Sequence, residues 1–311
     1  MRFHAGDIEL ELVQDWAKLP EGWSFRDVCG IATDEHDNVY VLNRSEHPVI
    51  VLTREGQFVE SWGHGFFSRA HGARRASDGS LFCTDDISHV VAKFSLRGEL
   101  LMQIGEKGLS SDTGYQQAWD LWQGIGSITR GGPPFNRPTG ITEGPDGDIY
   151  VSDGYGNARI HRFDSEGHLK YSWGEPGGRP GQFRLPHDIA LDSRDRLLVA
   201  DRENSRIQLF DTDGKYLDQW NNVVRPTGIS FDDSGNVFVS ELAMRVSIFT
   251  PDGELLGSWG NTTLDRDSAM FHAPHAIAID SHGDVYVGDV AYTHAKVDRG
   301  ANTIRKFRRV T

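Results

Sequence analysis

The amino-acid sequence predicts an all-β protein folded as a six-bladed β-propeller, because one pattern recurs six times along its 311 residues. Each copy starts with a small residue or a proline and continues through an apolar run, a turn of the D-x-x-G type and a second apolar run. A polar residue ends this pair of runs fifteen positions after the start. The copies extend from Val28 to Asn43, Ala70 to Asp85, Pro138 to Asp153, Pro186 to Asp201, Pro226 to Glu241 and Pro274 to Asp289.

Two further apolar stretches continue the pattern after each such pair. The third stretch ends in an aromatic residue, and the fourth usually ends in Ser-Trp-Gly or a similar sequence. Short runs with period-two alternation indicate strands, and four strands in about 40–50 residues are typical of a propeller blade. We therefore predict a single domain, residues 1–311, with blades at about 25–63, 67–105, 135–174, 183–220, 222–260 and 271–311 and an insertion at 106–134.

The N-terminal segment is predicted to complete the last blade. The sixth copy ends at the C-terminus without a fourth strand, whereas residues 8–16 (IELELVQDW) alternate like a strand and belong to no complete blade. A strand from this segment would close the ring and cover two strand edges that would otherwise lack partners.

Composition limits the partners and the location that we expect. The formal net charge of −13 disfavours nucleic acid and anionic membranes as partners. No apolar stretch is long enough to cross a bilayer, and the N-terminus lacks the apolar core of a secretion signal, so we expect a cytoplasmic protein. The two cysteines, Cys29 and Cys83, are expected to be buried free thiols. The sequence favours no particular oligomeric state.

Three histidines occupy the second position of the repeat, in copies two, four and six: His71, His187 and His275. The inner strand of a blade begins at the rim of the central channel, so equal phase in alternate blades brings three imidazoles toward the axis. Three imidazoles with an open fourth position are typical of catalytic zinc, although another divalent transition metal also suits them. The sequence therefore predicts a metal site with open coordination.

Two arginines and a tyrosine are predicted at the same rim. The first two strands of a copy form a hairpin, so the residues that follow the second strand return beside the start of the first. Arg44 and Arg202 hold that position in copies one and four, and Tyr155 follows the second strand of copy three. A guanidinium binds a carboxylate through two parallel bonds, which predicts a small anionic substrate. Positive charge nearby favours the phenolate of Tyr155 as a general base.

Plainer interpretations of these residues stay open at this point. Arg44 and Arg202 could pair with rim carboxylates such as Glu46 or Glu203, and Tyr155 could be a rim aromatic.

Several motifs resemble a known family. DGYGNARI (153–160), RPGQFRLPHDIAL (179–191) and VADRENSRIQLF (199–210), with AHG (70–72) and APHAIAI (273–279), are similar to the peptidyl-α-hydroxyglycine α-amidating lyase domain, a six-bladed propeller of the NHL-repeat type. The resemblance extends from about residue 26 to residue 307. It implies that the three histidines bind a catalytic zinc, that Tyr155 is the base, and that Arg44 and Arg202 are active-site arginines. The implied reaction cleaves an N-acyl-α-hydroxyglycine to a primary amide and glyoxylate.

The resemblance also implies a structural calcium in the channel, which this sequence supports poorly. The family places a carboxylate directly after the third histidine, where this chain has Ala276. Backbone carbonyls of Ile31 and Ala73 and the carboxylate of Asp188 are the remaining candidate ligands, whereas calcium prefers six to eight oxygens.

Two insertions relative to the repeat are expected on the histidine face: residues 106–134, which contain Trp119 and Trp122, and the segment after Asp289. They are interpreted as a lid over the pocket or, equally, as surface loops that pack on each other.

Other functions remain open as alternatives: another zinc-dependent lyase or hydrolase that acts on a small anionic substrate, and a non-catalytic NHL propeller that binds a partner. Propeller lactonases hold their metal with carboxylate and amide side chains, so three imidazoles favour zinc over that class.

Overall fold

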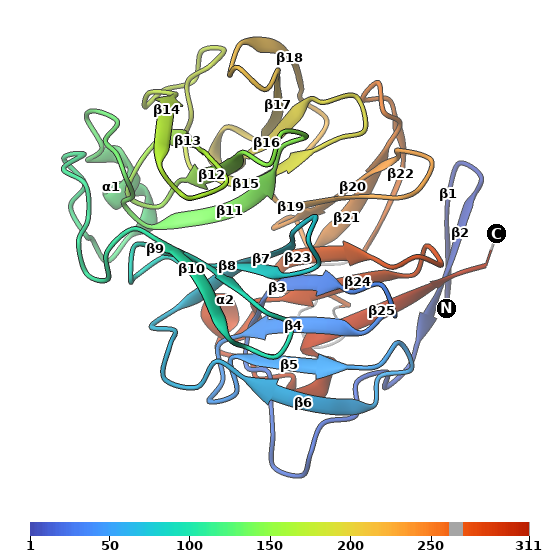
Figure 1. The fold of residues 1–311 in the computed structure, drawn as a ribbon. Helices are drawn as coiled ribbons and strands as arrows, with labels where there is room; N and C mark the ends of the chain where they lie inside the picture. The colour runs from blue at the N-terminus through green and yellow to red at the C-terminus, as the bar shows by residue number, and fades with distance from the viewer. Residues whose placement is uncertain (261–269, 311) are drawn as a thin grey trace. The chain divides into compact units, whose positions relative to one another are not determined.

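The computed structural model describes residues 1–260 and 270–310 and has the all-β, six-bladed propeller class that the sequence predicts. Residues 261–269 and Thr311, which fall within the predicted domain limits, lie outside the described residues. Each blade is one antiparallel sheet (Figure 1). In five of the blades the strands follow one another along the chain, and the sixth also takes in strands from the N-terminus. The chain forms two compact units, residues 67–226 and residues 1–66 with 227–311.

The unit of residues 67–226 contains three four-stranded blades. The second blade consists of β7 (Ala70–Arg75), β8 (Leu81–Asp85), β9 (Val90–Phe94) and β10 (Leu100–Ile104). The third blade consists of β11 (Pro138–Glu143), β12 (Ile149–Asp153), β13 (Arg159–Phe163) and β14 (Leu169–Trp173). The fourth blade consists of β15 (Pro186–Leu191), β16 (Leu197–Asp201), β17 (Arg206–Phe210) and β18 (Tyr216–Trp220).

The other unit contains the first, fifth and sixth blades. The first blade consists of β3 (Val28–Thr33), β4 (Val39–Asn43), β5 (Val49–Leu52) and β6 (Phe58–Trp62). The fifth blade consists of β19 (Pro226–Phe231), β20 (Val237–Glu241), β21 (Arg245–Phe249) and β22 (Leu255–Gly260). The sixth blade consists of β23 (Pro274–Ile279), β24 (Val285–Asp289), β25 (Ile304–Arg309) and two strands from the N-terminus, β2 (Ile8–Val13) and β1 (Arg2–Ala5).

The N-terminal segment takes the outer position of the sixth blade, as the sequence predicts. Strand β2 pairs antiparallel with β25, with Leu10 opposite Arg309. The structure adds β1, which pairs with β2 as a hairpin and makes this sheet five-stranded. The side chains of β2 alternate between buried and half-buried, because one face of the strand covers the core that contains Trp259 and Phe307.

Each blade buries its apolar side chains against its neighbours within the same unit. In one such cluster Ile160 of the third blade packs with Ile189, Val199 and Phe210 of the fourth. Burial of an aliphatic or aromatic side chain contributes roughly 1.5–3 kcal/mol, so these interfaces supply most of the stability. Strands β11, β12, β15 and β16 are buried almost throughout.

Short helices lie in the connections of the described part: α1 (Leu121–Gly126), α2 (Ala291–Ala295) and the 3₁₀ helices η1 (Arg202–Asn204) and η2 (Gly300–Thr303). The sequence pattern predicts loops in the insertion 106–134, whereas the structure forms α1 there. The side chain of Asp120 accepts a hydrogen bond from the backbone N–H of Trp122 and so caps this helix. Among the described residues no helix is both long and apolar enough to span a membrane. Cys29 and Cys83 are buried free thiols, as expected.

Candidate metal centre

His71 and His187 each take the second position of the inner strand of their blade. The two rings are buried, and both residues are 1% exposed. The pairing of β7 with β8 skips from Ala70 to Ala73, and that of β15 with β16 skips from Pro186 to Ile189. A break of this kind re-aims a side chain relative to the regular strand alternation. Both histidines lie inside such a break, at the same position of their blades. The break therefore sets the direction of each imidazole.

A backbone carbonyl fixes the ring of His71. Its Nδ1 lies 2.9 Å from the carbonyl oxygen of Thr139 in the next blade. A carbonyl oxygen only accepts, so Nδ1 carries the proton and the lone pair is on Nε2. Gly72 permits this close approach, because a Cβ at Gly72 would lie 2.4 Å from the same oxygen. The rings of His71 and His187 lie 4.7 Å apart, with their ligand nitrogens within 4.8 Å of each other.

Tyr155 lies against both histidines. Its hydroxyl oxygen is 3.3 Å from Nε2 of His71 and 3.4 Å from Nε2 of His187. Gly154, which directly follows β12, lets the chain pass close to the next blade, because a Cβ at this position would lie 2.2 Å from the carbonyl oxygen of Pro186. The structure therefore brings together three of the residues that the sequence singles out, with the phenol directed at the two imidazoles.

Arg202 adds a cation to this group. Its Nη1 donates to the hydroxyl of Tyr155 at 3.2 Å, and its Nε donates to Glu203 at 2.8 Å. Glu203 also pairs with Arg225 at 2.8 Å. Burial alone would raise the pKa of Glu203, but the charges of Arg202 and Arg225 hold that pKa below its usual value. The carboxylate of Glu203 therefore stays ionised at neutral pH and holds the guanidinium beside the phenol. Arg202 thus contacts Glu203 and Tyr155 at the same time.

Three residues near Tyr155 were missed by the sequence analysis: Arg69, Arg137 and Asp86. The guanidinium carbons of Arg69 and Arg137 lie 5.4 Å and 5.0 Å from the centre of the Tyr155 ring. Both guanidinium groups donate to Asp86, Arg69 at 2.7 Å and Arg137 at 2.8 Å. Three arginines, counting Arg202, thus lie around the ring of Tyr155.

The repeat contained a signal for these residues. Asp86 has the same phase as Arg44 and Arg202, directly after the second strand of a copy. Arg69 and Arg137 share another phase, directly before the first strand.

His275 and Arg44 belong to the other unit. His275 is the second residue of β23, the inner strand of the sixth blade, and is 5% exposed. Its Nδ1 donates to the carbonyl oxygen of Cys29 at 3.1 Å. As for His71, this bond leaves the lone pair on Nε2. Arg44 donates to the hydroxyl of Thr293 at 3.2 Å, and its Nη1 lies 3.7 Å from Asp27.

The donor chemistry of these histidines fits a transition metal. His71 and His187 are buried in one unit and His275 is buried in the other, and each offers a ring nitrogen that could bind a metal ion. In metal sites the ring nitrogen that does not bind the metal is usually held by a carbonyl or carboxylate, and His71 and His275 have that arrangement. Neutral imidazole nitrogen suits zinc better than it suits calcium or magnesium.

The calcium site implied by the resemblance does not fit the chain. Arg74 places its guanidinium beside Asp188, which is the one carboxylate among the candidate calcium ligands. It donates to the carbonyl oxygens of Ile141 and Ile189 at 3.3 Å each, and lies 3.3 Å from the carboxylate of Asp188. A cation of the chain itself therefore neutralises Asp188, and Ala276 supplies no carboxylate.

Calcium removal is consequently expected to leave the thermal stability of the protein unchanged. Differential scanning calorimetry with a calcium-selective chelator and with added calcium measures this directly. Arg74→Met is expected to lower the free energy of unfolding by about 1–2 kcal/mol, because it leaves carbonyls and a carboxylate without their donor. A midpoint that rises with added calcium in the unmodified protein would contradict this interpretation.

The comparisons with known proteins agree with the fold and with a lyase relationship. The NHL repeat model matches residues 135–163 and 183–210. Human NHL repeat-containing protein 3 is 28% identical over 94% of this chain and 82% of that protein. A probable peptidyl-alpha-hydroxyglycine alpha-amidating lyase of Caenorhabditis elegans is 31% identical over 61% of this chain, which spans 50% of the worm protein. The chain is therefore an NHL-repeat β-propeller with homology to proteins of both names.

Solved structures support the fold. A streptogramin B lyase structure superposes with a TM-score of 0.63 over 99% of this chain and 100% of that chain, at 17% sequence identity. At this identity the likeness concerns the propeller alone, since one fold hosts many functions.

Proposed function

We propose that the protein is a metal-dependent lyase that cleaves the C–N bond of an N-acyl-α-hydroxyglycine and releases a primary amide and glyoxylate. The observation that carries the proposal is the position of the Tyr155 hydroxyl, which lies within 3.4 Å of two imidazole Nε2 atoms and 3.2 Å from Nη1 of Arg202. A base beside metal-type ligands and a carboxylate-binding cation is what this cleavage requires. The homology to proteins named amidating lyases supports the same reaction.

Under this proposal His71, His187 and His275 hold Zn²⁺ or another divalent transition metal. The metal, when bound, polarises the hydroxyl of the substrate and makes it easier to deprotonate. Two of the ligands have their ring orientation set by a carbonyl, at Thr139 for His71 and at Cys29 for His275.

Tyr155 is the group that takes the proton from the substrate hydroxyl. The electron pair of that O–H bond forms the C=O bond of glyoxylate, the C–N bond breaks, and the amide nitrogen leaves with its electron pair and takes up a proton. Atoms balance without water, oxidant or reductant. Arg202 donates a hydrogen bond to the hydroxyl oxygen of Tyr155 and so holds the base in position. Arg202 with Arg44 binds the substrate carboxylate.

Glyoxylate release tests the proposal. Metal-loaded protein is incubated with N-acetyl- and N-benzoyl-α-hydroxyglycine, and glyoxylate is measured with and without a transition-metal chelator. We expect release that the chelator abolishes and that added zinc restores. Bound metal without glyoxylate from either compound would exclude the lyase assignment and leave another metal-dependent reaction. Absence of both metal and turnover would favour the non-catalytic binding propeller.

A further inference from the structure

The helix of the insertion packs directly on the proposed base. The side chains of Ile125 in α1 and Leu185 before β15 are buried together with the ring of Tyr155, and Leu121 packs at the edge of this group. The insertion therefore forms one wall of the site around Tyr155. Its six-residue helix would be marginal alone and depends on this packing.

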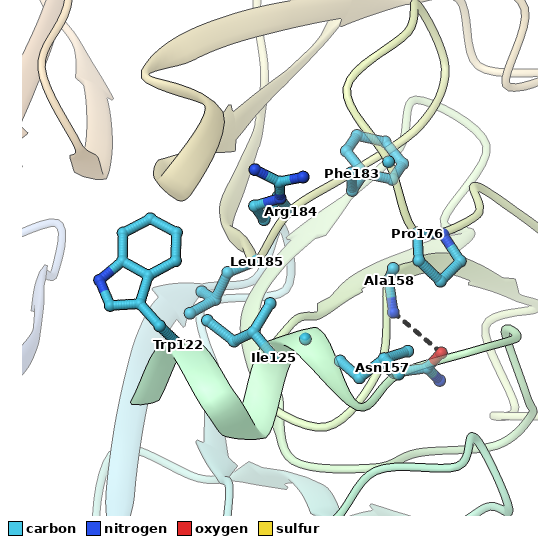
Figure 2. A pocket seen from close by; sticks show the side chains of 11 residues that line it. Trp122, Ile125, Asn157, Ala158, Pro176, Phe183, Arg184 and Leu185 are labelled. Atoms are coloured by element: carbon cyan, nitrogen blue, oxygen red, sulfur yellow. Dashed lines mark hydrogen bonds between the residues drawn. The ribbon is translucent and has the colours of Figure 1, made fainter. Parts of the chain in front are cut away.

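The same two side chains line a pocket on α1. The pocket has a volume of about 270 Å³, and its walls combine α1 with the segment before β15. Figure 2 shows Trp122, Ile125 and Leu185 on one side and Pro176 and Phe183 on the other, with Arg184 between the two sides. Ile125 and Leu185 thus contact Tyr155 and form part of the pocket wall.

Backbone hydrogen bonds connect this wall to the proposed carboxylate-binding arginine. The N–H of Arg202 donates to the carbonyl oxygen of Leu185 at 3.1 Å, and the N–H of Glu203 donates to the carbonyl oxygen of Arg184 at 3.0 Å. A group held in the pocket therefore lies against residues fixed to both Tyr155 and Arg202.

The lining indicates what the pocket accepts. Trp122 is 49% exposed at its edge, Phe183 is buried in its wall, and Arg184 also lines it. Aromatic and guanidinium groups of this kind favour contact with an aromatic ring. Its volume is below that of sites for drug-sized ligands, which are about 300–1,000 Å³, so it suits one ring-sized part of a larger molecule. We propose that this pocket binds the acyl group of the substrate and selects an aromatic acyl group; the inference rests on the proposed function.

Filling the pocket tests this inference. Gly126 lines the pocket, and a Cβ built on it meets no atom within 4 Å, so Gly126→Leu adds volume without a backbone clash. Gly178→Leu is the matched control, because Gly178 is an exposed glycine next to the lining residue Gly177 and its Cβ meets only Asn204, at 3.8 Å. We expect Gly126→Leu to raise KM for N-benzoyl-α-hydroxyglycine about tenfold and to change KM for the N-acetyl compound less than about twofold. The control is expected to match the unmodified protein with both.

Binding of N-benzoylglycine separates the pocket from the reaction. This compound lacks the hydroxyl and cannot be cleaved, so calorimetry reports its affinity whether or not the protein is a lyase. We expect it to bind more tightly than N-acetylglycine, and Gly126→Leu to remove that preference. Glyoxylate release with equal affinities for the two compounds overturns the pocket assignment alone. A preference that Gly126→Leu removes, without any glyoxylate, supports the pocket and overturns the reaction.

Discussion

Tyr155→Phe is expected to lower the turnover number for glyoxylate release by about 10²–10⁴-fold and to leave the amount of bound metal unchanged. The substitution removes only the hydroxyl oxygen, which lies 3.3 Å and 3.4 Å from the Nε2 atoms of His71 and His187. The ring and its packing on Ile125 and Leu185 are kept, so folding is preserved. Steady-state assays together with metal analysis of the same preparation measure both quantities.

Tyr115→Phe is the matched control for this variant. The hydroxyl of Tyr115 accepts a hydrogen bond from Arg137 at 2.7 Å, and Arg137 stacks on the ring of Tyr155. The control therefore removes a phenol oxygen near the site without touching the proposed base, and its turnover is expected to fall less than about tenfold. If Tyr155→Phe also retained a tenth or more of the activity, the role of Tyr155 as the base would be wrong.

The repeat phase made the central part of the site predictable. In a propeller equal phase means equal position within a blade, so aligning the copies placed His71, His187 and Tyr155 at one rim without any knowledge of contacts. The structure finds the three side chains together in one unit. The position of the N-terminal strand was predictable for a related reason. The sixth copy lacks a fourth strand and the N-terminal segment belongs to no other blade, so pairing the two completes the sheet.

Phase did not reveal which charges pair. Asp86 has the same repeat phase as Arg44 and Arg202 but the opposite charge. The structure shows that it pairs with Arg69 and Arg137, which the phase alone does not reveal. Ion pairing depends on side-chain directions between blades, and a repeat pattern within one blade does not encode them.

The insertion was unpredictable for another reason. Residues 106–134 have no counterpart in the other copies, and a helix of six residues is too short to show a 3.6-residue period. The cap residue Asp120 is the local sequence signal for this helix. It marks where the helix begins but not what the helix packs against. The contact of Ile125 with Tyr155 connects the insertion to the site. It is a tertiary contact between segments far apart in the sequence, so the local sequence does not reveal it.

His187→Ala is expected to reduce bound metal to less than about a tenth of the unmodified level, because a site with three protein ligands retains only two. Mass spectrometry of dialysed protein gives the metal content. Thermal unfolding gives an independent measure, since an ion that binds only the folded state raises the midpoint. Added zinc is expected to raise the midpoint of the unmodified protein and to leave that of the variant unchanged.

His161→Ala distinguishes loss of a ligand from loss of a buried histidine. His161 is fully buried in the same unit, and its ring bonds to Ser172 at 2.7 Å and to Asp153 at 3.3 Å. Its removal is expected to lower the free energy of unfolding by about 1–3 kcal/mol, since buried polar partners lose their hydrogen bonds, and to leave the metal content unchanged. His187→Ala should show the reverse, with metal lost and apoprotein stability affected less. Equal metal content in the two variants would show that His187 is a structural histidine, and the proposed reaction would then lack its metal site.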